Sequence, residues 1–190
     1  MANTATLYRF RIDLSDIDRG VYQALDLRVA RHPSEDEERL VVRVLAFALL
    51  AEEGLDFGRG LSTVEDAALW TRTPDGRVRL WVDVGVPGAD RLHRASKQAE
   101  RVVVVTHKSP EVLRKEWQGA KIFRPERVEV IRLAPTLVRE LAAGLERGLQ
   151  WYVTVQESGL VVVDGDRVVE APVEHTTVTA FLHAVSDAPG

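Results

Sequence analysis

The sequence predicts an α/β fold, a mixed β-sheet with antiparallel edges that is flanked by helices, and three observations support it. Residues 8–14 alternate apolar and polar side chains, which is the period-2 pattern of a strand. Residues 40–50 are apolar almost all round apart from Arg43, which is typical of a central, buried helix. Residues 102–105 are an unbroken valine run, as in a parallel strand that is covered on both faces.

The first two elements are expected to form an antiparallel hairpin. A turn over residues 16–20 joins the strand at 8–14 to a second strand at 21–30. In the segment that follows, Ser34 is placed to cap a helix while Glu37 reaches back, so the two predict a capping box.

The central part predicts a parallel crossover. The helix that begins near Ser34 is expected to end at Gly54, and residues 56–73 are expected to be irregular, with a short turn around 64–70. A tight turn at Asp75-Gly76 then leads into a strand at 77–85, a helix at 87–100 and the valine strand. Strand, helix and strand in this order predict a right-handed parallel unit.

The remaining elements complete a single domain over residues 1–190. Ser109 and Pro110 start a helix that runs to about residue 119. We further expect a strand at 128–133, a helix at 135–147, a meander at 151–170 and a loosely ordered end at 178–190. The helices should cover both faces of the sheet.

Composition excludes several classes of protein. The chain has no cysteine, so disulfides, thiolate zinc sites and a cysteine nucleophile are excluded. The N-terminal residues lack the pattern of a signal peptide and no apolar run could span a bilayer, so we expect a cytoplasmic protein without a membrane partner. A formal net charge of −4 means that any nucleic-acid binding must come from a local patch. Phosphate-loop, dinucleotide-binding, GxSxG and HExxH motifs are absent from the sequence.

Two acids conflict with the apolar pattern around them. Glu38 projects from the core side of its helix, so it either has a functional role or pairs with Arg31, Arg39 or Arg43. Asp83 lies near the carboxyl end of a strand in the parallel unit, where ligand sites usually form, although strand ends also use Asp as a cap.

Asp66 lies in the irregular segment beside Glu65, where surface acids are common. Arg94 and Lys97 lie on the helix after Asp83, and either one reaches back over the sheet edge or both belong to a solvated face.

The basic residues near the first helix suit phosphate. Arg31, Arg39 and Arg43 form a cluster whose guanidinium groups either bind a phosphate or neutralise Glu38 and Asp83. The histidines show no metal-ligand spacing.

Several short blocks occur in order along nearly the whole chain: Tyr8-Arg9-Phe10, Arg31-His32-Pro33-Ser34-Glu35 followed by Glu38-Arg39 and Arg43, Gly60-Leu61-Ser62, Leu69-Trp70, and Leu80-Trp81-Val82-Asp83-Val84-Gly85. Together they resemble the bacterial YaeQ family. The resemblance implies a restriction-endonuclease-like variant of the PD-(D/E)xK nuclease fold, in which acids bind Mg²⁺ or Mn²⁺ and activate water. Carried over, the helix acid is Glu38, the intermediate acid is Asp66 and the strand acid is Asp83.

The chain departs from the superfamily pattern at two positions. Gly85 stands where a lysine usually follows the strand acid, so the resemblance implies Arg94 as the substitute, ahead of Lys97. Ala67 follows Asp66 where relatives often carry proline.

Two functions remain open from the sequence. In the first, the chain is a Mg²⁺-dependent nuclease or phosphodiesterase in which Asp66 and Asp83 hold the ion, Glu38 orients the ion or the water, and Arg94 or Lys97 stabilises the phosphorane. In the second, it is a catalytically degenerate nuclease fold that acts as a binding or regulatory module. We expect modest Mg²⁺ or Mn²⁺ affinity at Asp66 and Asp83, and nucleic acid is the partner that the first function requires.

Overall fold

The fold is that of a computed structural model, which describes residues 5–59 and 66–186. Its elements in chain order are β1 (Thr6–Asp16), β2 (Val21–Arg31), α1 (Glu37–Leu49), β3 (Asp56–Phe57), β4 (Leu69–Arg72), β5 (Val78–Val84), α2 (Ala89–Gln98), β6 (Ala99–Thr106), α3 (Pro110–Trp117), the 3₁₀ turn η1 (Pro125–Arg127), β7 (Val128–Leu133), α4 (Pro135–Ala143), β8 (Gly148–Gln156), β9 (Gly159–Asp164), β10 (Arg167–Thr177) and α5 (Val178–Ser186). The hairpin, the buried helix and the crossover are confirmed.

One mixed sheet connects all described strands, in the order β2-β1-β8-β9-β10-β7-β6-β5-β4-β3. The pairs β1/β8, β5/β6 and β6/β7 are parallel, and the other pairs, including both edges, are antiparallel. The antiparallel edges are therefore confirmed, whereas three consecutive inner pairs, β8/β9, β9/β10 and β10/β7, are antiparallel too and the parallel pairs lie to either side of them.

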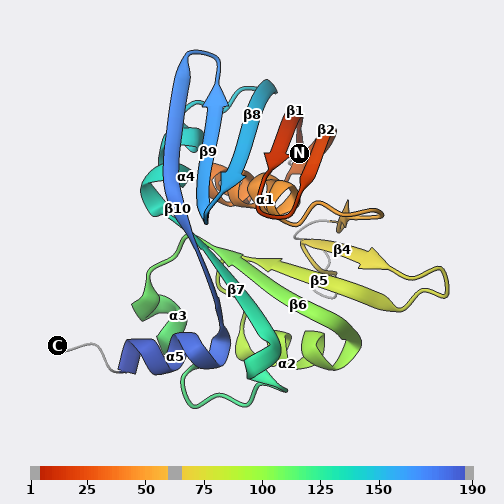
Figure 1. The fold of residues 1–190 in the computed structure, drawn as a ribbon. Helices are drawn as coiled ribbons and strands as arrows, with labels where there is room; N and C mark the ends of the chain where they lie inside the picture. Colours follow the sequence, from red (N-terminus) through yellow and green to blue (C-terminus); the bar gives the residue numbers. More distant parts are fainter. Residues whose placement is uncertain (1–4, 60–65, 187–190) are drawn as a thin grey trace.

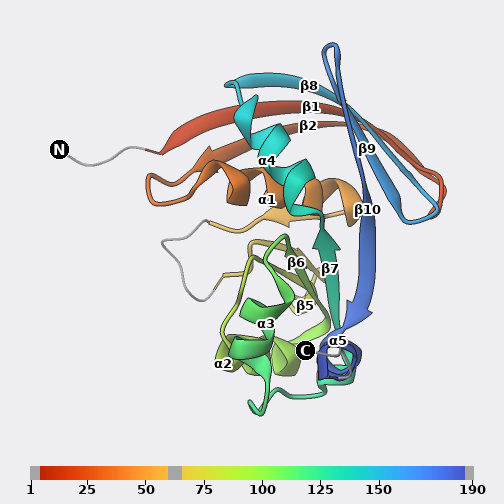
Figure 2. The ribbon, with the colours of Figure 1, turned by 90° about the vertical axis from the view of Figure 1, so that its left-hand side faces the viewer.

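The long strand β10 joins two halves of this sheet. Residues 167–172 pair with β9, and residues 173–177 pair with β7. Between them the sheet bends, so that one half arches over α1 and α4 while the other half runs below them (Figures 1 and 2). The sheet is consequently large and nearly closed, like a barrel, with helices flanking it.

Helix α1 lies inside this bend, which explains its apolar sequence. Residues Leu40 to Leu49 are all buried. They share one core with inward side chains of both halves of the sheet, among them Phe10 of β1, Leu80 of β5 and Trp151 of β8. A helix that is enclosed on every side has no solvent face to keep polar.

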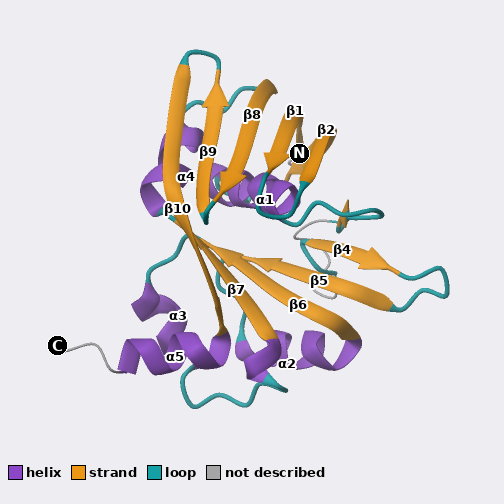
Figure 3. Ribbon diagram, viewed as in Figure 1, coloured by secondary structure: helices purple, strands orange, loops and turns teal. Residues whose placement is uncertain are grey.

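The outer face of the lower half carries a second core. Trp81 of β5, Leu92 of α2, Trp117 of α3 and Phe181 of α5 pack there against Val104. The helices therefore cover different faces of the sheet: α1 and α4 one face, and α2, α3 and α5 the other (Figure 3).

Several local predictions were wrong. Asp36, not Ser34, caps α1, and its carboxylate accepts from the backbone N–H of Arg39 at 2.7 Å, while Ser34 bonds His32. The helix ends at Leu49, ahead of Gly54.

The segment expected to be irregular holds the short strands β3 and β4. The turn expected around 64–70 lies partly outside the described residues, and Glu65 lies wholly outside them. Residues 178–186 form helix α5, where we expected a loose end, because Val178 and Phe181 bury themselves against α3 and β7. Along the two described ranges, no helix combines the length and the apolar character that crossing a bilayer requires.

Candidate functional site

Two of the predicted acids, Asp83 and Glu38, lie near the carboxyl ends of β5 and β6. Asp83 is the penultimate residue of β5, and Glu38 belongs to the first turn of α1. On β5, Val82 and Val84 belong to the core around α1 and Trp81 to the core under α2. Because side chains alternate along a strand, Asp83 projects on the α2 side, whereas Glu38 approaches the strand ends from the α1 side.

The carboxylate of Asp83 is occupied by an arginine from α2. Arg91 donates from Nε to Oδ2 at 2.8 Å and from Nη2 to Oδ1 at 2.7 Å. The Asp83 side chain is 4% exposed and that of Arg91 is 23% exposed. The pair is thus a buried, bidentate ion pair in which both carboxylate oxygens are engaged.

Arg94 and Lys97, the residues predicted to reach Asp83, point elsewhere. Both are exposed, and the Lys97 ammonium lies 6.0 Å from the centre of the Phe123 ring. The residue that reaches Asp83 is Arg91, one helical turn earlier, which the sequence interpretation missed.

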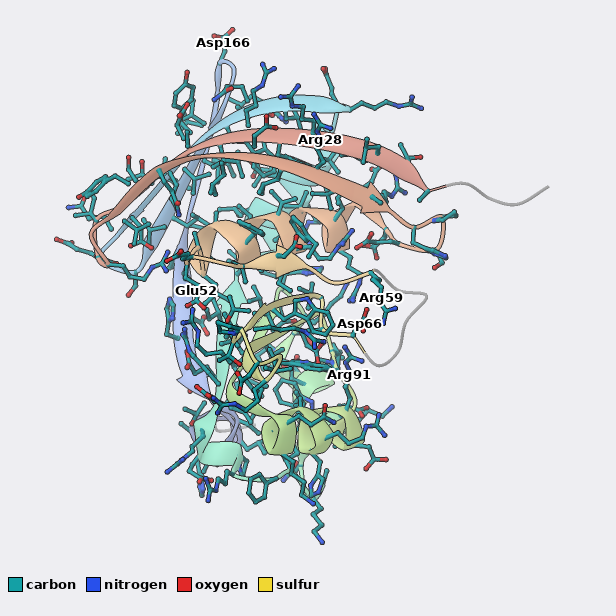
Figure 4. All side chains as sticks on the ribbon, turned by 90° about the vertical axis from the view of Figure 1, so that its right-hand side faces the viewer. Arg28, Glu52, Arg59, Asp66, Arg91 and Asp166 are labelled. Atoms are coloured by element: carbon teal, nitrogen blue, oxygen red, sulfur yellow. The ribbon has the colours of Figure 1, made fainter. Side chains whose placement is uncertain are left out.

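Asp66 lies beside this pair and is held by a second arginine. Arg59 donates from Nε to Oδ2 of Asp66 at 2.7 Å and from Nη2 to Oδ1 at 3.2 Å. These hydrogen bonds from Arg59 hold the pKa of the Asp66 carboxyl below its usual range. The backbone carbonyl of Asp66 also accepts from Arg91 at 2.6 Å, so Arg91 joins Asp66 to Asp83 (Figure 4).

Glu38 pairs with a histidine and with none of the three predicted arginines. Its Oε2 lies 2.9 Å from Nε2 of His107, the residue that follows β6. The Glu38 side chain is 33% exposed, but His107 is buried. Burial, and secondarily the charge of Lys108, lower the pKa of His107, which is therefore neutral at pH 7 and donates to Glu38.

The predicted phosphate cluster gathers around a carboxylate that the sequence interpretation left without a role. Glu35 is buried, and Arg43 contacts both of its oxygens, at 2.7 and 2.8 Å. Arg31 donates to the Glu35 carbonyl at 2.8 Å. Arg43 therefore neutralises the Glu35 carboxylate, and Arg31 satisfies the Glu35 backbone carbonyl. Among the contacts of the described residues, neither arginine touches Glu38 or Asp83.

Arg39 connects this cluster to the end of β5. Its Nη1 donates to the carbonyl of Val84 at 2.6 Å, and its Nε lies 3.8 Å from Glu35. Burial lowers the pKa of Arg39, against the opposing effect of Glu35 and Asp83. Gly85 has φ +90° and a Cβ at this position would lie 3.0 Å from Arg39, so glycine permits both the turn and the close approach of the guanidinium.

The described side chains do not fit a divalent metal ion in this arrangement. Within the described ranges, no three His, Asp or Glu side chains gather closely enough to hold one. Mg²⁺ requires free oxygen donors, whereas Asp66 and Asp83 each give both oxygens to a guanidinium. Arg91 joins Asp83, through an ion pair, to Asp66, through the backbone carbonyl, while the Asp66 carboxylate pairs with Arg59.

The sequence held partial signals for the residues that were missed. Glu35 precedes Arg39 and Arg43 by four and eight positions, the spacing of one helix face, although Glu35 itself lies before α1. Arg91 precedes Arg94 by three positions on the same helix, and only the placement of α2 on the sheet distinguishes them.

The fold and the site together define a helix-flanked, mixed α/β protein whose strand-end acids are held by arginines. The family model described as YaeQ protein matches residues 1–173, and the chain belongs to the YaeQ family. The YaeQ protein of Escherichia coli strain K12 is 30% identical over 169 residues, which cover 88% of this chain and 92% of that protein.

Two crystal structures of YaeQ proteins share the fold. The protein from Pseudomonas syringae is 36% identical with a TM-score of 0.80, over 92% of this chain and 96% of that one. The protein from Xanthomonas axonopodis pv. citri is 34% identical with a TM-score of 0.82, over 92% and 98% of the two chains.

Proposed function

We propose that the chain is a binding module built on a PD-(D/E)xK nuclease-like scaffold, with an arginine–carboxylate network where a nuclease would hold its metal ion. The scaffold assignment is supported by the order of elements: an acid on the buried helix, Glu38, an acid before the parallel unit, Asp66, and an acid at the end of its first strand, Asp83. The restriction-endonuclease-like variant is proposed on the same grounds.

The observation that carries the proposal is the occupation of Asp83 by Arg91. A guanidinium group keeps its charge at every pH that a folded protein tolerates, so deprotonation does not free the carboxylate. A metal ion at Asp83 would have to displace a bidentate, buried partner that also bonds the carbonyl of Asp66. Binding of the ion would therefore have to offset the loss of three charge-assisted hydrogen bonds made by Arg91.

The proton chemistry around the site also favours binding over catalysis. Gly85 stands at the position of the usual lysine. Arg94, the residue that the resemblance implies as a substitute for this lysine, cannot act as a general base. His107 is buried, with its Nε2 on Glu38 and its Nδ1 without a hydrogen-bond partner in the described part of the chain, so burial separates the ring from solvent. The arrangement can therefore bind and orient a ligand, but its described residues offer no free base beside Asp83.

A Mg²⁺-dependent phosphodiesterase is the second candidate, and one observation favours it. Arg91 bonds Asp66 and Asp83 at once, so the two acids that the family resemblance assigns to the metal stand at one edge of the sheet. This function would require an arrangement of Arg59 and Arg91 that releases both carboxylates.

A cleavage assay separates the two functions. The purified full chain is incubated with single-stranded, duplex and structured DNA and RNA in the presence of Mn²⁺. We expect no cleavage. Cleavage that Glu38→Gln abolishes, and that the exposed control Glu146→Gln retains, would replace the module with the phosphodiesterase.

A further inference from the structure

A group of basic side chains surrounds Phe123 on the outer face of the lower half of the sheet. The Lys97 ammonium lies 6.0 Å from the centre of the Phe123 ring, the Arg124 guanidinium lies 5.0 Å away, and the His93 ring packs edge-on at 6.5 Å. Arg94 neighbours Lys97 on the exposed side of α2. We call Arg94, Lys97, Lys121 and Arg124, together with Phe123, the Phe123 strip.

The cations of the Phe123 strip have no ion-pair partner among the described residues. Arg94, Lys97, Lys121 and Arg124 are exposed, and none forms an ion pair with a carboxylate of the described residues. Asp90 and Glu126, the exposed acids on the same segments, pair with none of the four. The four cations therefore form a positive surface on a chain whose formal net charge is −4.

The backbone and the ring nitrogens at the strip add two independent observations. Arg124 adopts the left-handed conformation with φ 48°, outside the hairpin turn that accounts for the other described non-glycine residues with positive φ. This conformation is costly for a side-chain-bearing residue, and Arg124 adopts it immediately before η1, with its guanidinium over the Phe123 ring. Nδ1 of His93 is buried without a hydrogen-bond partner in the described part of the chain.

The chemistry of the strip matches a single-stranded polyanion with flat bases. Lysine and arginine bind phosphates, and Phe123 holds the Lys97 and Arg124 cations over its ring. A base that stacks on the ring would take the place of one of these cations, which would then be free to contact a phosphate. Arg91 and Arg94 are three positions apart on α2, so the strip continues on the helix surface to the Asp83–Arg91 pair.

We propose that the Phe123 strip binds the phosphodiester backbone of single-stranded nucleic acid. The inference rests on the proposed binding module and names the class of its ligand. Four phosphate contacts on a single strand give a slope of about −2.8 for log K against log salt, which weakens affinity about 50-fold between about 50 and 200 mM salt.

Fluorescence anisotropy with labelled oligothymidylate and oligouridylate tests the proposal. EDTA is present throughout, so neither a metal ion nor cleavage enters the measurement. The Arg94→Gln/Lys97→Gln protein is expected to lose about half of the slope, to about −1.4, because two of the contacts are removed. Phe123→Leu is expected to weaken binding about tenfold at constant slope through lost stacking.

The matched control is Arg11→Gln/Arg28→Gln, which removes one exposed arginine from β1 and one from β2. Arg28 lies on the convex side of these strands, remote from α2 (Figure 4). Its slope should equal that of the parent protein. Equal losses in both double variants, binding that is insensitive to salt, preference for duplex, or binding only to vesicles of anionic lipid would each overturn the proposal. The proposed function is tested by the separate cleavage assay with Mn²⁺. Loss of the nucleic-acid proposal in the anisotropy experiment therefore does not decide the result of that assay.

Discussion

Replacing Arg91 with methionine tests the ion pair at the end of β5. The substitution keeps an unbranched apolar stem but removes both hydrogen bonds to the Asp83 carboxylate and the bond to the Asp66 carbonyl. Asp83, with a side chain that is 4% exposed, would then be a buried charge without a partner. Loss of one partner from a buried pair costs about 3–5 kcal/mol, and because water reaches Arg91, we expect about 3 kcal/mol.

Thermal and urea unfolding measure this loss. In a chain of this size, about 3 kcal/mol corresponds to a decrease in Tm of about 6–12 °C. The control Arg94→Met, at an exposed position on the same helix, should stay within about 0.5 kcal/mol of the parent. Adding Asp83→Asn to Arg91→Met should recover part of the loss, since the stranded charge is gone. Equal stability of Arg91→Met and the parent, or a larger loss in Arg94→Met, would refute the assignment of Arg91 as the partner of Asp83.

Three further perturbations test the surrounding network. Glu35→Gln should lower the free energy of unfolding in urea by about 3–5 kcal/mol, because buried Arg43 loses its carboxylate partner. A loss below about 1 kcal/mol would instead indicate a solvent-screened pair. Gly85→Ala should cost about 1–3 kcal/mol, because φ is +90° and the new Cβ would press on Arg39, and an unchanged unfolding midpoint would contradict this. Burial lowers the pKa of His107, so the unfolded state binds more protons than the folded state, and stability should fall as pH decreases below about 6.5. His107→Gln should flatten that part of the stability curve, and an identical slope in the variant would show that His107 does not cause it.

Elements that are defined by the spacing of their apolar side chains could be predicted from the sequence. The alternation around Phe10 and Ile12 identified β1, and the all-round apolar run from Leu40 identified α1, because each pattern states how many faces of an element are buried. Helix α5 was missed although Val178, Phe181 and Leu182 recur at helical spacing.

The closure of the sheet could not be read from the chain. It depends on β10, which pairs with β9 up to Pro172 and with β7 from Val173. No local sequence pattern predicts this change of partner.

The sequence could single out two acids by their setting, but it could not identify the bases that pair with them. Strand position and core-side spacing singled out Asp83 and Glu38, and both lie at the strand ends. Which base reaches each acid depends on how α2 and β6 are oriented, so Arg91 and His107 replaced the expected partners. Burial of Glu35 follows from packing of the β2–α1 connection against Arg43, which a run of acids before a helix does not reveal.

Calorimetric titration of Mn²⁺ into the parent protein and the Asp83→Asn variant tests the central claim most directly. If Arg91 takes the place of a metal ion at Asp83, the two proteins should give the same small, nonsaturating heats. Saturable binding of one ion by the parent protein that disappears in Asp83→Asn would contradict the arginine-held site and restore the metal-dependent enzyme.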